Sequence, residues 1–459
     1  MEHQIPILRH NITIRDAIQT IERSGFPSGF LLDAEGCYRG ELFEGDLRRL
    51  LVSGAADYDK ISDFEPRHSL RLRSSDLGKP HVLHRLAEDM QLARAAFVPV
   101  LSDTGEIVDA FSSERAAGYK DASAILSEAP SYSKRVLVVG GAGYLGSILT
   151  RKLLKEGYSV RVLDNFIYGR KSLADIEEEK NLEIVQGDLR HIDTVTTATI
   201  DVDAVVLLAA IVGDPASRIR PSETIETNLL ASQALATACK VQHINRFVYA
   251  STCSVYGAND SLLDETAALN PVSLYARTKI SSEQIILGMG DKYFAPTILR
   301  MGTLYGLSPR MRFDLVVNTM TMKAFTDKEI TVFGGNQWRP LLHVEDAADA
   351  FVASLKADIK LVGNQVFNVG SDEQNYQIDQ IGQIVSETLG GVPIRRYEAD
   401  RDVRDYRVTF KKIREYLSFT PKRTVEYAVK EIFHTLENKV INDPTRKIYY
   451  NHYFDSSEE

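Results

Sequence analysis

Val136–Gly157 reads VLVVGGAGYLGSILTRKLLKEG, in which an apolar strand runs directly into a glycine-rich turn and then into a segment of helical periodicity. Gly140, Gly143 and Gly146 provide, in that order, a tight turn, close approach of a pyrophosphate to the backbone, and close packing of helix on strand. The helix N-terminus, expected near Gly143, offers free N–H groups and a positive dipole end to phosphate. The stretch therefore predicts a strand–turn–helix unit that binds a dinucleotide.

The same rhythm continues along the chain, because apolar runs at 160–163, 182–187, 204–210 and 246–251 alternate with segments of helical period. Strands that are apolar at every position are buried on both faces, as in a parallel sheet covered by helices. Right-handed crossovers between such strands give a doubly wound, Rossmann-type α/β fold whose ligands bind at the carboxyl ends of the strands. We expect this fold class.

Asp164 ends the second of these strands, 18 residues after Gly146. A carboxylate at this place accepts hydrogen bonds from both ribose hydroxyls and repels a 2′-phosphate, so the predicted cofactor is NAD rather than NADP. Arg161 is expected to point elsewhere, whereas Arg170 leaves an NADP contact open. Asp188 follows the third strand and is predicted to contact the adenine edge or to cap the next helix. A glycine turn without a ligand is the alternative, and the coincidence of strand, glycines and acid argues against it.

The composition limits the class of protein. With 459 residues, 44% of them apolar and 25% charged, the chain is expected to form two or three globular domains. A formal charge of −9 disfavours nucleic-acid and anionic-membrane partners. Three cysteines without a CxxC pair predict a reducing compartment and neither a disulfide framework nor a metal site. Without a signal-peptide core or a run of about 18 apolar residues, a cytoplasmic protein is expected.

The region before this fold contains a weak internal repeat. SGFLLDAEGCYRGELFEGDLRRLL (Ser28–Leu51) resembles AAFVPVLSDTGEIVDAFSSERAA (Ala95–Ala117), each with a strand, a glycine turn, a second strand and a polar helix start. Gly36 and Gly105 are 69 residues apart, which suits a tandem repeat. Small and polar residues after this region predict a linker. The predicted parts of the chain are a domain at 1–120, a linker at 121–133 and a domain at 134–459.

Tyr275 and Lys279, in SLYARTK, are four residues apart in a segment of helical period, so both side chains lie on one face. Free tyrosine has a pKa of about 10, too high for a base at neutral pH. A nearby ammonium and the positive nicotinamide ring favour the phenolate and lower that pKa. Tyr275 is then predicted to take a proton from a sugar hydroxyl while hydride leaves to NAD. A Tyr/Lys pair on a solvated helix face is the alternative.

Several short segments occur in one order along the chain. They are GGAGYLG (140–146), Asp164, GDLR (187–190), LLAA (207–210), Asn228, STCSVYG (251–257), YARTK (275–279), LRMGTLYG (299–306), RPLLHVED (339–346) and NVGS (368–371). On these residues, the segment from about 134 to 440 resembles an extended short-chain dehydrogenase/reductase of the NAD-dependent nucleotide-sugar epimerase/dehydratase family. The resemblance implies a Rossmann core followed by a smaller, C-terminal substrate-binding part.

The resemblance also implies roles for individual residues. Tyr275 is the base, and Lys279 binds the nicotinamide ribose and tunes Tyr275. Thr252 hydrogen-bonds the substrate hydroxyl, and Asn228 supports the lysine through a water. The expected cofactor-binding residues, with NAD as the cofactor, are Gly140, Gly143, Tyr144, Leu145, Gly146, Asp164, Asn165, Asp188, Leu189, Ala209, Tyr275 and Lys279.

The two residues after Thr252 distinguish the reactions of the family that the chain resembles. Dehydratases carry Asp–Glu there, whereas this chain has Cys253 and Ser254. Related decarboxylases carry glutamate, and 3,5-epimerases cysteine, at the place of Ser254. Water elimination needs an acid and a base, which serine serves poorly. The expected function is therefore a NAD-dependent nucleotide-sugar epimerase acting at C4, in which Tyr275 alone handles the proton.

Two other functions stay open. A nucleotide-keto-sugar reductase that uses NAD(P)H would carry the same residues, and the NAD preference given by Asp164 favours the epimerase over it. An adenine-nucleotide sensor whose dehydrogenase-like half binds without reacting is disfavoured, because Tyr275, Lys279 and Thr252 are all present.

The substrate implied by the resemblance is a nucleotide-diphosphate sugar. Asn318 and Arg339 stand where family members contact the diphosphate, and arginine suits two-pronged binding of phosphate. A salt bridge from Arg339 to the region of Glu345 is the alternative. Arg404, in RDVRDYR, replaces the usual arginine of the C-terminal nucleotide loop, whose place falls near Ala399. For this segment a solvated charged face is the alternative.

Residues 5–118 resemble a pair of CBS repeats, a module that often binds adenine nucleotides between its halves. Asp46, in GELFEGDLRRLL, stands at the place of the ribose-binding acid. Phe43 stands where Ser or Thr usually contacts phosphate, and Arg115 replaces the acid in the second repeat. A structural or dimerising role is therefore the alternative to nucleotide binding. Because the helices that carry the catalytic residues form a dimer bundle in the dehydrogenase family, a homodimer or higher homo-oligomer is expected.

Overall fold

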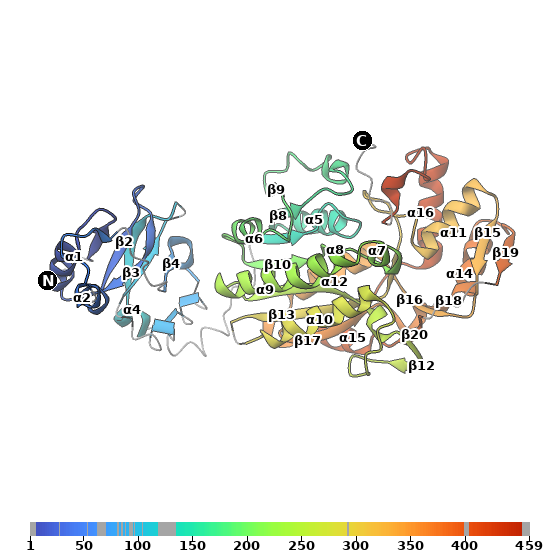
Figure 1. The fold of residues 1–459 in the computed structure, drawn as a ribbon. Helices are drawn as coiled ribbons and strands as arrows, with labels where there is room; N and C mark the ends of the chain where they lie inside the picture. Colours follow the sequence, from blue (N-terminus) through green and yellow to red (C-terminus); the bar gives the residue numbers. More distant parts are fainter. Residues whose placement is uncertain are drawn as a thin grey trace. The chain divides into compact units, whose positions relative to one another are not determined.

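The computed structural model describes residues 6–451 apart from 27, 53, 62–69, 80–81, 84–85, 88, 91–94, 96, 103, 118–134, 292 and 399–403. The chain forms two compact units, Met1–Pro130 and Ser131–Glu459 (Figure 1), and each is described by itself. The predicted linker at 121–133 and the loop position near Ala399 lie outside the described residues.

A parallel sheet forms the centre of the second unit. Its seven strands are β7 Arg135–Val139, β8 Ser159–Asp164, β9 Leu182–Gln186, β10 Ala204–Leu207, β11 Arg246–Thr252, β13 Ala295–Met301 and β17 Gln365–Val369. They are ordered β17-β13-β11-β10-β7-β8-β9, so the direction of winding reverses between β7 and β10. All six neighbouring pairs are parallel. This arrangement confirms the predicted Rossmann-type fold, in which ligands bind beside that reversal.

Helices cover both faces of the sheet. They are α5 Gly146–Lys155, α6 Ile192–Ala198, α9 Ala231–Val241, α10 Leu274–Gly288 and α12 Val344–Lys356. Successive strand residues point to opposite faces. Val136 and Val138 pack with α5 and α12, whereas Leu137 and Val139 pack with α6, α9 and α10. Figure 1 shows α9 and α10 running side by side. Burial of both faces explains why the strands are mostly apolar on both sides.

A smaller part of the second unit has its own core, which includes Val317, Val332, Ile381 and Val429. Its strands are β12 Ala258–Leu263 with β20 Asp405–Val408, β15 Ile330–Phe333 with β19 Ile394–Tyr397, and β14 Thr303–Tyr305, β16 Trp338–His343 and β18 Asn375–Gln377. Its helices are α11 Val316–Thr326, α14 Ile378–Thr388 and α16 Val425–Glu437. Helix α15 Lys411–Leu417 packs against β17, and its Ile413 belongs to the main core. Shorter helices elsewhere in the unit are α7 Asp214–Ile219, α8 Pro221–Ile225 and α13 Ile359–Val362.

The N-terminal unit contains the internal repeat in its strand pairing. Its two sheets are β1 Ile7–Arg9, β2 Ser28–Leu32 and β3 Tyr38–Phe43, and β4 Leu72–Arg73, β5 Phe97–Leu101 and β6 Ile107–Ser112. In each sheet the first pair of strands is parallel and the second antiparallel. Ser28 pairs with Phe43, and Phe97 with Ser112, at the 69-residue offset that separates Gly36 from Gly105. The two hairpins therefore share one register.

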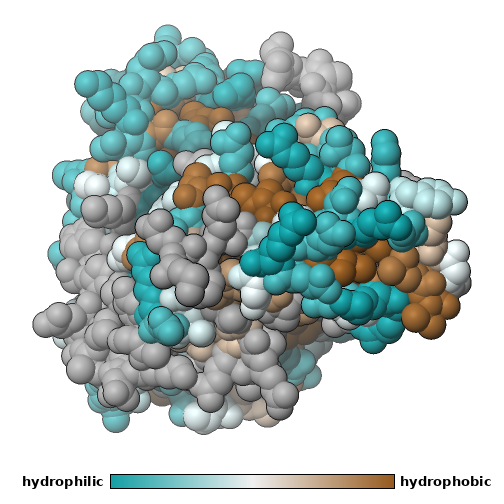
Figure 2. Space-filling view, turned by 90° about the vertical axis from the view of Figure 1, so that its left-hand side faces the viewer, coloured by the Kyte–Doolittle hydropathy of each residue, from teal (hydrophilic) through white to brown (hydrophobic). Residues whose placement is uncertain are grey.

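Each repeat also has its own apolar core, with Ile14 and Ile21 in one and Val98 and Phe111 in the other. The helices of the repeats are α1 Ile14–Ser24, α2 Glu44–Val52 and α4 Ser113–Ala117. Figure 2 shows hydrophobic groups between hydrophilic ones on the face drawn there. Among the helices that the structure describes, none is long and apolar enough to cross a membrane.

Candidate active site

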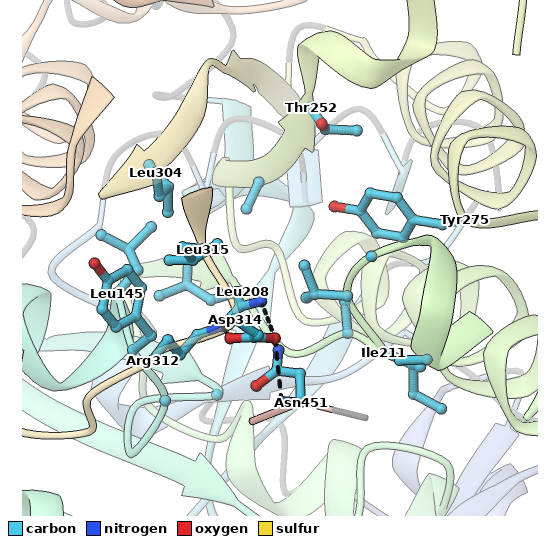
Figure 3. A pocket seen from close by; sticks show the side chains of 18 of the residues that line it. Leu145, Leu208, Ile211, Thr252, Tyr275, Leu304, Arg312, Asp314, Leu315 and Asn451 are labelled. Atoms are coloured by element: carbon cyan, nitrogen blue, oxygen red, sulfur yellow. Dashed lines mark hydrogen bonds and ion pairs between the residues drawn. The ribbon is translucent and has the colours of Figure 1, made fainter. Parts of the chain in front are cut away.

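A cavity of about 940 Å³ lies at the carboxyl ends of the central strands. Val139, Asp164 and Thr252 line it from the ends of β7, β8 and β11, and Tyr275 lines it from α10. Figure 3 shows Tyr275 and Thr252 on one side of the cavity and Arg312 on another. A volume of this size is typical of sites for cofactors and small ligands.

The glycine turn after β7 is folded tightly on itself. A Cβ at Gly140, whose φ is +87°, would lie 2.7 Å from Ala209 N, and a Cβ at Gly146 would lie 2.0 Å from Gly140 O. A Cβ at Gly143 would lie 3.2 Å from the same oxygen. The turn therefore excludes side chains and presents backbone to the cavity, which fits the diphosphate of a dinucleotide.

The helix after the turn begins later than predicted. Helix α5 starts at Gly146 rather than near Gly143, because a turn at residues 142–145 comes first. The first helical hydrogen bond nevertheless reaches back into the turn, because Ser147 N donates to Gly143 O at 2.9 Å. The free N–H groups of the helix start therefore belong to the turn itself.

Asp164 points back across the glycine turn. Its Oδ2 accepts from Ala142 N at 2.9 Å and its Oδ1 from Phe166 N at 2.8 Å. Burial raises the pKa of the Asp164 carboxyl, and these two hydrogen bonds and the Arg310 cation oppose the shift. Each carboxylate oxygen keeps a further lone pair, so the group still has acceptors for ribose hydroxyls.

Arg161 and Arg170, the two arginines that the sequence offers near Asp164 for a contact with NADP, do not contact its carboxylate. Arg161 points elsewhere, as predicted, and donates to Glu183 Oε2 at 2.7 Å and to Ala198 O at 2.9 Å. Arg170 is exposed and lies over the Phe166 ring, 4.8 Å from its centroid. Neither arginine lines the cavity where a 2′-phosphate would lie.

Asp188 lines the cavity, and it does not cap the next helix. Helix α6 begins after His191, whose side chain makes no capping bond. Instead, Asp188 Oδ1 accepts from Arg190 N at 2.9 Å, and Asp188 Oδ2 accepts from Arg190 Nη2 at 2.7 Å. This pairing lowers the pKa of Asp188 to about 2. The capping alternative is wrong, and the adenine contact stays a prediction. The other predicted cofactor residues that line the cavity are Tyr144, Leu145, Asn165, Leu189 and Ala209.

Helix α10 brings Tyr275 and Lys279 to one side of the cavity, as their spacing predicts. Burial raises the pKa of the Tyr275 hydroxyl, and the Arg312 cation and a hydrogen bond with the Thr252 side chain oppose the shift. Lys279 Nζ lies 6.0 Å from the Tyr275 ring centroid and donates to Ala250 O at 2.8 Å. Among the protein's own groups, desolvation of the phenol outweighs the opposing contributions. The lowering by the ammonium together with the nicotinamide ring stays a prediction.

Lys279 is itself buried, with 3% of its surface exposed. Its Nζ lies 4.6 Å from the centroid of the Tyr249 ring. Burial lowers the pKa of Lys279 to about 7, and Glu283, one helical turn further on, opposes the shift. Because the amine is anchored on a strand carbonyl, it is held in one place beside the cavity.

Asn228 lies in a π-helical turn, η5 Glu226–Leu230, that joins α8 to α9. Such turns are frequent at functional sites. Asn228 Oδ1 accepts from Ile211 N at 2.8 Å, and its Nδ2 donates to Ile211 O at 3.0 Å and to Thr278 Oγ1 at 3.4 Å. Asn228 thus joins the loop after β10 to the residue beside Lys279. The water link to the lysine stays a prediction.

The side chains of the two residues after Thr252 lie in different surroundings. Ser254 lines the cavity, and its Oγ lies 3.3 Å from Tyr406 OH. Cys253 is fully buried in the core, where its Sγ donates to Arg300 O at 3.2 Å. Burial raises the pKa of the Cys253 thiol. Cys253 therefore points away from the position of any substrate.

Two of the predicted substrate residues meet at the cavity. Arg339 Nη1 donates to Arg404 O at 2.7 Å, and both residues line the cavity. Arg404 Nε also pairs with Asp214 Oδ2 at 3.5 Å. Glu345 and Asp346, the acids offered as alternative partners of Arg339, each pair with Arg423.

Asn318 is fully buried and does not line the cavity that the described residues form. Its Oδ1 accepts from Gly306 N at 2.9 Å, and its Nδ2 donates to Tyr144 OH at 3.1 Å and to Arg312 O at 2.9 Å. Asn318 therefore fixes the loop that carries Arg312 against the glycine turn. Its contact with substrate stays a prediction.

The cavity is also lined by polar residues that the sequence did not single out, among them Asp214, Arg310, Arg312 and Asn451. Asp214 follows a strand end, which is a signal that could have found it. Arg310 and Arg312 follow the LRMGTLYG segment closely. Asn451 carries no local signal, because it reaches the site from the far end of the chain.

The sequence pattern of the NAD dependent epimerase/dehydratase family matches residues 136–370, more than half of the chain. The chain therefore belongs to this family, and its cofactor is NAD. The match runs from β7 to the end of β17, so it includes the whole sheet, the glycine turn and Tyr275.

Relatives of this chain are named for more than one reaction. The "Uncharacterized UDP-glucose epimerase YtcB" of Bacillus subtilis is 32% identical over 252 residues, which are 52% of this chain and 78% of that protein. The UDP-glucuronic acid 4-epimerase of Bacillus cereus, solved with UDP-glucuronic acid and NAD, is 25% identical with a TM-score of 0.59 over 66% of this chain and 99% of that chain. DesIV, a dTDP-glucose 4,6-dehydratase of Streptomyces venezuelae solved with NAD and TYD, is 25% identical with a TM-score of 0.61 over 66% of this chain and 97% of that chain.

Proposed function

We propose that this protein is a NAD-dependent nucleotide-sugar epimerase that inverts C4 through a keto-sugar. The observation that carries the proposal is the identity of the group beside Thr252 and Tyr275: it is the Ser254 hydroxyl, while Cys253 lies in the core. A hydroxyl does not supply the acid and base that elimination of water needs. The relatives named as epimerases of UDP-glucose and UDP-glucuronic acid support the same reaction.

In the proposed reaction, Tyr275 removes the proton of the sugar's C4 hydroxyl, and Thr252 holds the same oxygen through its own hydroxyl. NAD, when bound, accepts the C4 hydride and brings a positively charged ring that favours the tyrosine phenolate. Lys279, anchored on Ala250 O, binds the ribose beside that ring. After the keto-sugar turns over, hydride would return to the other face of C4 and Tyr275 would return the proton to the C4 oxygen, so a cycle would leave the cofactor and the tyrosine unchanged.

The far end of the cavity is assigned to the nucleotide part of the substrate. Arg339 and Arg404 supply positive charge for the diphosphate. Asp214, paired with Arg404, is assigned to a sugar hydroxyl, because carboxylate oxygens accept such donors.

The reaction is tested by incubating the protein, without added cofactor, with UDP-, dTDP-, GDP- and CDP-sugars and following the sugar signals by NMR. The expected result is a mixture of C4 epimers from one substrate class. Tyr275→Phe should slow this by about 10²–10⁴-fold and still retain NAD, whereas Tyr416→Phe, at an exposed position, should not. A 4-keto-6-deoxy product would contradict the proposal. So would steady consumption of NADH with a 4-keto substrate, the result expected of the reductase.

For the N-terminal unit we propose a pair of CBS repeats that binds an adenine nucleotide. The shared register of the two hairpins supports a tandem repeat. Asp46, the predicted ribose ligand, lies on α2 and pairs with Arg49. Calorimetry with AMP, ADP and ATP tests the proposal, with Asp46→Ala expected to remove binding. If no adenine nucleotide binds, the unit has the structural or dimerising role, and sedimentation with and without it then measures the homodimer.

A further inference from the structure

Two polar groups in the cavity have no hydrogen-bond partner among the described residues. Arg310 is 5% exposed, and its Nε and Nη2 make no hydrogen bond there. Asn451 is 6% exposed, and its Oδ1 is likewise unsatisfied. Both residues line the cavity. Buried donors and acceptors are almost always paired, because leaving a polar or charged group unpaired in the interior is costly. The pair therefore indicates a ligand with both an anionic group and a hydroxyl.

Asn451 is held in place from two sides. Its N donates to Asp314 Oδ2 at 3.1 Å, and its O accepts from Tyr168 OH at 3.4 Å. Two residues earlier in the chain, Tyr449 O accepts from Phe313 N at 2.9 Å. Figure 3 shows Asn451 beside Asp314, on the side of the cavity away from Thr252. The C-terminal segment thus forms part of the cavity wall.

Arg310 lies near the adenosine end of this cavity. Its guanidinium carbon lies 3.8 Å from the centroid of the Tyr168 ring, and Tyr168 follows Asp164 by four residues. The positive charge of Arg310 acts on Asp164, where it lowers the pKa against the effect of burial. Arg312 differs, because Asp314 neutralises it through bonds of 2.9 and 2.8 Å. Arg310 therefore keeps its charge available between the ribose-binding acid and the glycine turn.

We propose that Arg310 and Asn451 form a subsite for the adenosine-diphosphate half of NAD, in which the guanidinium donates to a phosphate oxygen and Asn451 Oδ1 accepts from a ribose hydroxyl. The position beside Asp164 and the glycine turn favours the cofactor, because the diphosphate of a dinucleotide lies between these two features. The chemistry, a diphosphate next to a ribose, also occurs in the nucleotide sugar. The subsite holds whichever reaction the enzyme catalyses, so its test does not depend on turnover.

The test is calorimetry of protein washed free of NAD, with ADP-ribose, adenosine and UDP as separate ligands. Arg310→Met should weaken ADP-ribose binding by about 10- to 100-fold, the value of one charge-assisted hydrogen bond. Adenosine and UDP should change by less than about twofold. Asn451→Ala should weaken ADP-ribose by about fivefold, as expected for a neutral hydrogen bond.

Two controls keep the result interpretable. Arg170→Met removes another arginine that lies over an aromatic ring, at the surface, and should leave all three affinities unchanged. Arg310→Lys keeps the charge, so partial recovery of ADP-ribose binding shows that the loss in Arg310→Met is not a folding defect. Loss of UDP binding in place of ADP-ribose binding would assign the arginine to the nucleotide sugar and overturn the proposal. Unchanged affinities in both variants would overturn it as well.

Discussion

Glu283→Gln is predicted to destabilise the second unit strongly, because it breaks a buried ion pair. Glu283 on α10 and Arg300 on β13 expose 2% and 6% of their side chains. Arg300 Nη2 lies 2.6 Å from Glu283 Oε2, and its Nε lies 3.1 Å from each carboxylate oxygen. Ser251 Oγ donates to the same carboxylate. The pair therefore ties the catalytic helix to two strands of the sheet.

The size of the fall in the free energy of unfolding follows from the hydrogen-bond partners that Arg300 would retain. After the substitution its remaining partners are Tyr256 OH at 3.0 Å and Glu265 O at 3.5 Å, neither of which carries the missing charge. An amide in place of the carboxylate also turns a donor toward either Arg300 or Ser251, which are donors themselves. Removing one member of a buried pair costs about 3–5 kcal/mol, so we expect the free energy of unfolding to fall by that amount.

Urea unfolding followed by tryptophan emission measures this loss for the second unit alone, because Trp338 on β16 is the only tryptophan of the chain. The matched control is Glu156→Gln, which breaks the pair with Lys356, whose side chains are 41% and 38% exposed. This control substitution should lower the free energy of unfolding by at most about 1 kcal/mol. Replacing both buried partners by apolar residues, as in Glu283→Leu with Arg300→Met, should cost less than the sum of the single changes. A loss below about 1 kcal/mol for Glu283→Gln, or additive effects in the double variant, would refute the reasoning.

Three further predictions concern the site. Gly146→Ala should abolish NADH binding in a fluorescence titration, because its Cβ would lie 2.0 Å from a backbone oxygen, whereas Gly288→Ala, with nothing within 4 Å, should bind normally. Cys253→Ala should retain turnover, because its thiol points into the core; a tenfold loss would show that it acts on substrate. Burial lowers the pKa of Lys279 to about 7, whereas an unfolded lysine titrates near about 10.4, so the unfolded chain binds more protons between these values and stability should rise with pH across that window. Lys279→Met should flatten this rise in urea unfolding curves recorded from pH 7 to 10, and an unchanged slope would contradict the assignment.

The fold could be predicted because its signals are local. The central strands are apolar at most of their positions, since both sheet faces are covered, and the glycines meet a geometric need that no other residue satisfies. Tyr275 and Lys279 were found for a similar reason: a spacing of four residues on a helix is enough to place both on one side. The repeat of the N-terminal unit was also visible, because Gly36 and Gly105 mark equivalent turns.

Other properties of the site depend on contacts between distant segments. The pKa of Tyr275 rises because the folded protein removes water from the phenol, and the spacing of Tyr275 and Lys279 carries no information about that burial. The side-chain amide of Asn318 bonds Gly306, Tyr144 and Arg312, contacts that no local pattern indicates. Asn451 meets Asp314 across 137 residues. A motif search along the chain does not find such pairs, because neither residue is unusual where it stands.

The hydrogen bonds within the cavity wall that holds the glycine turn, the loop before Arg310 and the C-terminal segment bear on the choice between epimerase and reductase. A reductase exchanges its cofactor in every cycle, whereas an epimerase must keep the reduced cofactor until hydride returns to the sugar. Tyr144, in the glycine turn, donates to Gly306 O at 2.6 Å, so the turn is tied to the loop that leads to Arg310. Asn451 ties the same wall to the C-terminal segment. These bonds join the glycine turn, the loop before Arg310 and the C-terminal segment. A reaction with internal return of hydride requires slow release of the reduced cofactor, so the rate at which bound NADH leaves the protein is the measurement that separates the two reactions.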